Sequence, residues 1–186
     1  MTFDLAGALR RLRPQRISPA IARRADADLT LVEGPAQPGP ELLLDTCVYI
    51  DVLQGRTPPE VDDLLNLRIL NHSTVSLSEL THLLGRLDPQ HPDTAATLRQ
   101  LSGVVADIPG HRLLRPSERA CGEAGILAGL TVRLAGRTKG VDLLNDTMLL
   151  LQAAENGQVV LTRNLQDFDL LQQLRPQSSV LFYRRL

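Results

Sequence analysis

Four acidic residues in separate parts of the chain have the types and positions that could carry out chemistry: Asp45, Glu79, Asp146 and Asp167. Carboxylates gathered at one place raise each other's pKa values unless a cation lies among them. Hard oxygen ligands without His or Cys match Mg²⁺ or Mn²⁺. Such an ion lowers the pKa of a bound water, and the resulting hydroxide can attack a phosphodiester in line. The four acids therefore predict metal-assisted phosphodiester hydrolysis.

The hydrophobic pattern predicts that alternating strands and helices position these acids. Short apolar runs predict strands at 42–44, 74–77, 113–114, 159–161 and 180–183. Helical periodicity predicts helices over about 3–13, 47–53, 58–71, 93–106, 117–134, 143–155 and 168–174. Strands separated by helices are joined by right-handed crossovers. We therefore expect a doubly wound α/β fold, with a mostly parallel sheet of about five strands flanked by helices.

The acids fall where such a sheet binds its ligands, beyond the carboxyl ends of the strands. Asp45 directly follows the strand at 42–44, and Glu79 comes two residues after the strand predicted at 74–77. Asp146 lies near the start of its helix, and Asp167 follows the strand at 159–161. The topology therefore predicts that all four side chains project toward one edge of the sheet.

The segments around the acids resemble the motifs of PIN domains. The run 42–50, LLLDTCVYI, looks like an opening strand that ends in Asp-Thr, and VSLSEL at 75–80 resembles the motif that carries a Glu. NDTMLL at 145–150 resembles the third motif, and VLTRNLQDF at 160–168 is similar to the fourth, of the form T-R-N-x-x-D-F. The resemblance covers about residues 41–186 in the expected order, and it is greatest to VapC-like toxins.

This resemblance implies a Mg²⁺-dependent endoribonuclease, a homodimer, and a cognate antitoxin that occludes the site. By motif, Asp45, Glu79 and Asp146 correspond to metal-coordinating acids, and Asp167 corresponds to a fourth acid of more variable role. Thr162 and Asn164 are expected as supporting polar groups. Thr46 fits two roles equally well, as a hydrogen-bond donor in the turn or as the group that positions a metal-bound water.

Several alternatives stay open at this point. Glu79 alone could be an acid that stabilises a helix N-terminus. Asp142 and Asn145 compete with Asp146, and Asp169 competes with Asp167. Cys47 has no evident His partner, which favours a buried thiol over a nucleophile. A non-catalytic PIN-like module that binds RNA or protein is the main alternative function.

The composition is compatible with this interpretation. The chain has 186 residues, 43% of them hydrophobic, and a formal net charge of −1. The two cysteines make no disulfide framework or zinc spacing. We find neither an apolar run long enough for a membrane span nor a targeting segment, and expect a cytoplasmic protein.

The first forty residues differ from the rest. Residues 1–40 are expected to form a basic N-terminal extension with a Pro-rich linker at 35–40, and 41–186 the nuclease domain. The arginines of the extension suit either RNA or an acidic partner, and the sequence does not choose between them. Within the nuclease domain, Arg137, Lys139 and Arg163 are the candidates for contacts to RNA phosphates.

Overall fold

The computed structural model describes residues 3–136 and 141–186, which form an α/β fold around a sheet of five parallel strands. The strands are β1 (Leu42–Leu44), β2 (Leu70–Ser73), β3 (Leu113–Leu114), β4 (Val159–Thr162) and β5 (Ser179–Phe182). Their order across the sheet is β3-β2-β1-β4-β5, and every pairing is parallel. The predicted doubly wound fold is therefore confirmed.

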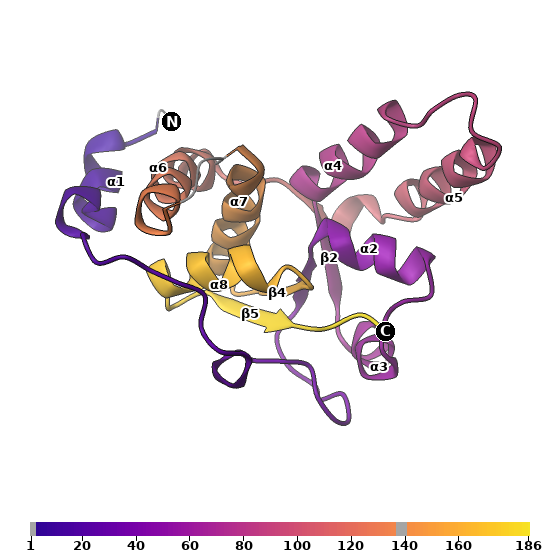
Figure 1. Ribbon diagram of the computed structural model, residues 1–186, viewed down its shortest axis with the longest axis horizontal. Coiled ribbons are helices and arrows are strands. Elements are labelled where there is room, and N and C mark those ends of the chain that lie inside the picture. The colour runs from indigo at the N-terminus through magenta and orange to yellow at the C-terminus, as the bar shows by residue number, and fades with distance from the viewer. Residues whose placement is uncertain (1–2, 137–140) are drawn as a thin grey trace.

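Helices cover both faces of this sheet (Figure 1). They are α1 (Leu5–Leu12), α2 (Thr46–Leu53), α3 (Pro59–Leu67), α4 (Thr74–Gly85), α5 (Thr94–Ala106), α6 (Glu118–Leu134), α7 (Val141–Glu155) and α8 (Leu165–Leu174). In the part of the chain that the structure describes, no helix combines the length and apolar character needed to cross a bilayer.

The hydrophobic core has two layers, because successive side chains of a strand point to opposite faces. Leu43, Val160 and Phe182 pack with the helices α6, α7 and α8. Leu42 and Leu161 pack on the other face, with α2, α3, α4 and α5. Both faces of the central strands are thus covered, which explains why β1 is a continuous run of leucines.

The second strand was predicted at the wrong place. It lies at Leu70–Ser73, where the sequence predicted the end of a helix, and 74–77 opens α4 instead. Ser73 accepts a hydrogen bond from the backbone N–H of Val75 at 3.1 Å and so caps this helix. The polar residues of β2 are compatible with burial because they have partners: Asn71 donates to Glu41 at 2.8 Å, and Ser73 donates to Gln152 at 2.7 Å. Glu79 therefore lies in the second turn of a helix that starts directly at the end of β2.

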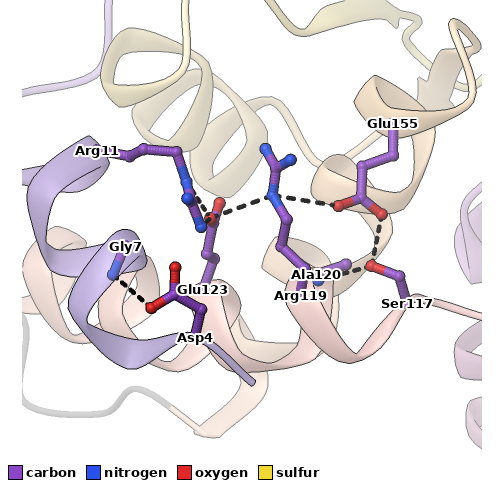
Figure 2. Close-up of polar contacts among 8 residues, drawn as sticks. All are labelled: Asp4, Gly7, Arg11, Ser117, Arg119, Ala120, Glu123 and Glu155. Carbon is purple, nitrogen blue, oxygen red and sulfur yellow. Dashed lines mark hydrogen bonds and ion pairs between the residues drawn. The ribbon is translucent and has the colours of Figure 1, made fainter. Parts of the chain in front are cut away.

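The N-terminal extension packs against the rest of the chain. Helix α1 lies beside α6, and its residues Ala8 and Leu12 are buried. Figure 2 shows Arg11 reaching from α1 to Glu123 on α6, where its Nη2 lies 2.5 Å from Glu123 Oε1. Glu123 is only 1% exposed, so this ion pair joins the two helices inside their contact.

The extension then runs to the edge of the sheet at β5. The backbone N–H of Phe182 donates to the carbonyl of Thr30 at 2.9 Å, and that of Val32 donates to the carbonyl of Phe182 at 2.7 Å. Leu31 and Phe182 form a parallel bridge through these bonds. The extension therefore covers the β5 edge in the manner of a short additional strand.

Candidate active site

The candidate site begins with Asp45 and Thr162, which meet at the carboxyl ends of two neighbouring strands. Asp45 follows β1 and is the N-cap residue of α2, and Thr162 is the last residue of β4. Because β1 and β4 are paired in parallel, both chains leave the sheet at the same edge. The Thr162 hydroxyl donates to Asp45 Oδ2 at 2.6 Å. The strand pairing therefore sets the orientation of the Asp45 carboxylate.

The Asp45 carboxylate is buried and lies close to other negative charge. Its residue is 5% exposed, and the thiol of Cys47 donates to the same Oδ2 at 3.0 Å. Burial raises the pKa of Asp45, and the charge of Glu79 raises it further, while the hydrogen bonds from Cys47 and Thr162 oppose the rise. The pKa of the Cys47 thiol is raised too, by burial and by the neighbouring Asp45 charge. Cys47 is thus a protonated donor to the site and a poor nucleophile.

Glu79 connects three helices at this edge. Thr46, the first residue of α2, donates its hydroxyl hydrogen to Glu79 Oε2. Asn145 of α7 donates to Glu79 Oε1 at 2.8 Å. Both carboxylate oxygens are therefore held, and the partly buried Glu79 lies close enough to Asp45 for its charge to act on that carboxylate. Asn145, which the sequence presented only as a competitor of Asp146, instead orients Glu79.

Asn164 joins the remaining two acids. Its Nδ2 lies 3.0 Å from Asp146 Oδ2 and 2.9 Å from Asp167 Oδ2. Its Oδ1 accepts the backbone N–H of Asp167 at 3.2 Å, which makes Asn164 the N-cap of α8. The cap also explains why α8 begins at Leu165 and not at the predicted Phe168. One side chain thus starts the helix that carries Asp167 and bridges the carboxylates from α7 and α8.

Thr, Asn and Cys side chains donate hydrogen bonds to all four acids of the site. Among the side chains that the structure describes, in residues 3–136 and 143–186, no three His, Cys, Asp or Glu groups lie closely enough to hold a metal ion by themselves. Mg²⁺ takes one or two carboxylates and keeps several waters, so it does not require such a cage. A buried carboxylate with a raised pKa beside a second acid is a place where a cation is favourable. The all-oxygen acids of this edge therefore suit Mg²⁺ or Mn²⁺ by their chemistry.

Arg163 has a structural partner behind the site. Its Nε lies 2.6 Å from Oδ2 of Asp51, which is 0% exposed and also accepts the hydroxyl of Tyr183 at 2.9 Å. Asp51 was not singled out from the sequence, because its partners are Arg163, which follows β4, and Tyr183 in the C-terminal segment. Arg137 and Lys139, the other two predicted RNA contacts, lie outside the described residues.

Comparison with known proteins identifies the fold. No family model matches the sequence, and no curated protein matches it. Among solved structures, a chain of DNA-bound VapBC from Salmonella typhimurium is 21% identical, with a TM-score of 0.55 over 76% of this chain and 97% of that chain. A chain of VapBC2 from Rickettsia felis, bound to a DNA fragment from its promoter, is 16% identical, with a TM-score of 0.53 over 77% of this chain and 98% of that chain.

A third similar structure is FitAcB from Neisseria gonorrhoeae, with a TM-score of 0.54, 17% identity, and coverage of 76% of this chain and 96% of that chain. Each match includes nearly the whole of the neighbour but leaves about a quarter of this chain outside it. At these identities the similarity establishes the fold. The chain therefore has the fold of the matched chains in these VapBC and FitAcB structures, which is the PIN-like fold that its four motifs predicted.

Proposed function

We propose that this protein is a Mg²⁺-dependent endoribonuclease that acts as the toxin of a toxin–antitoxin pair. The observation that carries the proposal is the meeting of Asp45 and Thr162 at the carboxyl edge, with Glu79 beside them. Three separate segments contribute to this arrangement, and they coincide with the motifs by which the sequence resembles PIN ribonucleases.

The residues of the site would have two kinds of role, to hold the metal ion and to orient the acids that hold it. Asp45, Glu79 and Asp146 would hold Mg²⁺ or Mn²⁺, with Asp167 as a fourth acid. When bound, the ion would supply a water of lowered pKa and neutralise charge on the phosphate. Thr162 and Cys47 hold the Asp45 carboxylate in one orientation, and Thr46 and Asn145 do the same for Glu79. Asn164 keeps Asp146 and Asp167 together although both are acidic.

The proposal of an antitoxin partner comes from the neighbours. The similar solved structures are of VapBC2, VapBC and FitAcB, and the first two are bound to DNA. We propose a comparable partner for this chain, together with a homodimer. A small reading frame beside the gene is the first place to look for the partner, and its co-expression should relieve growth arrest caused by this protein. Light scattering on the purified protein measures the oligomeric state.

The test of the nuclease is RNA cleavage by the purified full chain with Mg²⁺ or with EDTA. We expect discrete cuts that require the ion and that Asp45→Asn reduces by about 100-fold or more. Asp63→Asn, an exposed acid on α3, is the matched control and should cleave like wild type. Equal cleavage by Asp45→Asn and wild type would refute the site. Metal-independent RNA binding without cleavage would instead favour the non-catalytic module.

A further inference from the structure

The structure separates the arginines of the N-terminal extension into two groups. Three of the six between positions 10 and 24 form ion pairs within the chain: Arg11 with Glu123, Arg23 with Asp26, and Arg24 with Asp169. The other three, Arg10, Arg13 and Arg16, are exposed, and the structure shows no ion pair for any of them among the residues it describes. The first group thus holds the extension in place, and the second is left to face solvent.

The three exposed arginines line one surface hollow. This hollow has a volume of about 340 Å³ and is otherwise lined by Leu9 and Gln15, with no acidic residue. Helix α1 ends at Leu12, and a single 3-10 turn over Pro14–Arg16 follows. The reversal of the chain at this turn brings residues 10, 13 and 16 around the same space. The result is a concave surface that carries three positive charges.

The backbone at Arg13 is an unfavourable place for an arginine. Its φ of 43° and ψ of 50° are left-handed, and it is the only residue other than glycine with positive φ in the described part of the chain. Glycine is the usual residue at such a helix end, because a Cβ in this conformation lies too close to the following carbonyl oxygen. A guanidinium at this position therefore comes with a loss of stability, which is common where a side chain has a function.

Stabilisation of the helix end explains only part of this cluster. Cations at a helix C-terminus interact favourably with its dipole, and Arg13 Nε does donate to the carbonyl of Arg10 at 3.2 Å. That effect fades within the last turn, however, and Arg16 lies beyond the helix. Three guanidinium groups around one hollow, none in an ion pair with the described residues, exceed what the end of an eight-residue helix requires.

The hollow is held in shape from the opposite side. Arg133 of α6 donates from Nη2 to the carbonyls of Pro14 and Ile17, at 2.7 and 3.0 Å. Arg11 is held by Glu123, as Figure 2 shows. Because both ends of the turn are tied to α6, a ligand would meet an arrangement that is already formed, and binding would not have to order it.

We propose that Arg10, Arg13 and Arg16 form a binding site for the phosphodiester backbone of RNA, separate from the four acids. Guanidinium groups donate paired hydrogen bonds to phosphate oxygens and are always charged. Contacts of this kind hold a strand without reading its sequence. The identification of the polyanion as RNA rests on the proposed function. The solved structures leave about a quarter of this chain outside the match, so the extension offers a contact in addition to the shared fold.

The test is the salt dependence of RNA binding by the full chain. An Asp45→Asn background in EDTA prevents cleavage, and a short fluorescein-labelled single-stranded RNA reports binding by anisotropy. Each phosphate contact contributes about 0.7 to the slope of log K against log salt for a single strand. We expect the triple variant Arg10→Gln, Arg13→Gln, Arg16→Gln to lower that slope by about 2 and to raise Kd severalfold.

Two matched triples make the result specific. Arg56, Arg99 and Arg185 are also exposed and carry the same charge, and their replacement by Gln should leave the slope nearly unchanged. Lys at 10, 13 and 16 should retain the slope, and thermal melts verify that each variant is folded. Equal slopes for the two Gln triples would overturn the site. So would unchanged RNA binding together with lost binding to phosphatidylserine vesicles, which would assign the arginines and the exposed Leu5 and Leu9 to a membrane.

The outcome is independent of the nuclease test. If wild type cleaves RNA and both Gln triples bind it alike, the basic site is refuted and the proposed function stands. If wild type cleaves nothing but the triple at 10, 13 and 16 binds RNA less tightly, the basic site stands and the proposed nuclease fails.

Discussion

Asp169 is completely buried, and both of its carboxylate oxygens accept hydrogen bonds from Arg24: Oδ2 from the backbone N–H at 2.7 Å and Oδ1 from Nε at 2.5 Å. This pair joins the extension to α8 across 145 positions of the chain. Loss of one partner of a buried ion pair typically destabilises a protein by about 3–5 kcal/mol, because the other charge stays buried.

Arg24→Ala should therefore lower the free energy of unfolding by about 3 kcal/mol, measured by urea denaturation. Arg23→Ala is the control, since Arg23 pairs with the partly exposed Asp26 and should cost less than about 1 kcal/mol. Similar losses for the two variants would mean that the extension contributes no more than a surface ion pair.

A second prediction uses the contact between Phe3 and Gly122. A Cβ added at Gly122 would meet the Phe3 ring at 2.4 Å, whereas at Gly125, one turn further along α6, nothing lies within 4 Å. Gly→Ala in an exposed helix normally stabilises by up to about 1 kcal/mol. Gly125→Ala should raise the melting temperature. The melting temperature of Gly122→Ala should lie below that of Gly125→Ala, and this variant should expose the Arg10–Arg16 region to trypsin.

Equal gains in melting temperature for Gly122→Ala and Gly125→Ala, with unchanged protection from trypsin, would show that the position of the Phe3 ring does not depend on the space at Gly122. Gly129→Ala provides a further reference, because it also has open space around it.

The third prediction concerns the pH dependence of stability without metal. Because burial and Glu79 raise the pKa of Asp45, the folded chain holds that proton more tightly than the unfolded chain. Below the ordinary carboxyl pKa both states are protonated and burial of Asp45 carries no charge penalty. As pH rises through the ordinary pKa toward the raised one, the wild type loses stability and Asp45→Asn does not.

In EDTA, Asp45→Asn should thus be more stable than wild type at pH 7, and the difference should disappear near pH 3. Addition of Mg²⁺ should raise the melting temperature of wild type and not of the variant, since binding to the folded state alone is stabilising. A wild type that is the more stable of the two at pH 7 in EDTA would contradict this account of Asp45.

A fourth prediction separates the two roles of Asn164. Asn164→Asp keeps an oxygen that can cap α8 but replaces the amide donor between Asp146 and Asp167 with a third negative charge. The α8 cap should be retained, the third charge should lower the melting temperature in EDTA, and cleavage should fall by about 10–100-fold, as for groups that orient metal ligands. Asn164→Ala should lose both activity and about 1 kcal/mol of stability. Full cleavage by Asn164→Asp would limit Asn164 to capping.

The parts of the fold that depend on local pattern were predictable from the sequence. The leucine run at 42–44 and the valines at 159–160 are short apolar runs typical of strands buried on both faces, and the edge of the sheet that carries Asp45 follows from them. The strand β2 was not predictable, because its residues Asn71, His72 and Ser73 are polar. They are buried only because Glu41, Tyr49 and Gln152 supply their hydrogen bonds, and those partners are distant in sequence.

The candidate site was likewise predictable from the sequence only in part. The motifs gave the acids and the expectation that Thr46, Thr162 and Asn164 support them. The hydrogen bonds of Thr162 to Asp45 and of Asn164 to two acids depend on the pairing of β1 with β4 and on the packing of α7 against α8. For this reason the hydrogen bonds from Asn145 to Glu79 and from Arg163 to Asp51 could not be predicted from the sequence. Asn145 nevertheless lies next to a motif acid.

The bridge between Leu31 and Phe182 has a consequence for how this protein is made. Residues 30–32 leave the ribosome long before residue 182 is added, so their pairing partner does not exist while most of the chain is being synthesised. In the same way, Arg24 is synthesised before its ion-pair partner Asp169, and Arg11 is synthesised before Glu123. The extension is therefore synthesised well before the strand it pairs with, and a nascent chain stalled before β5 would leave residues 30–32 without their partner.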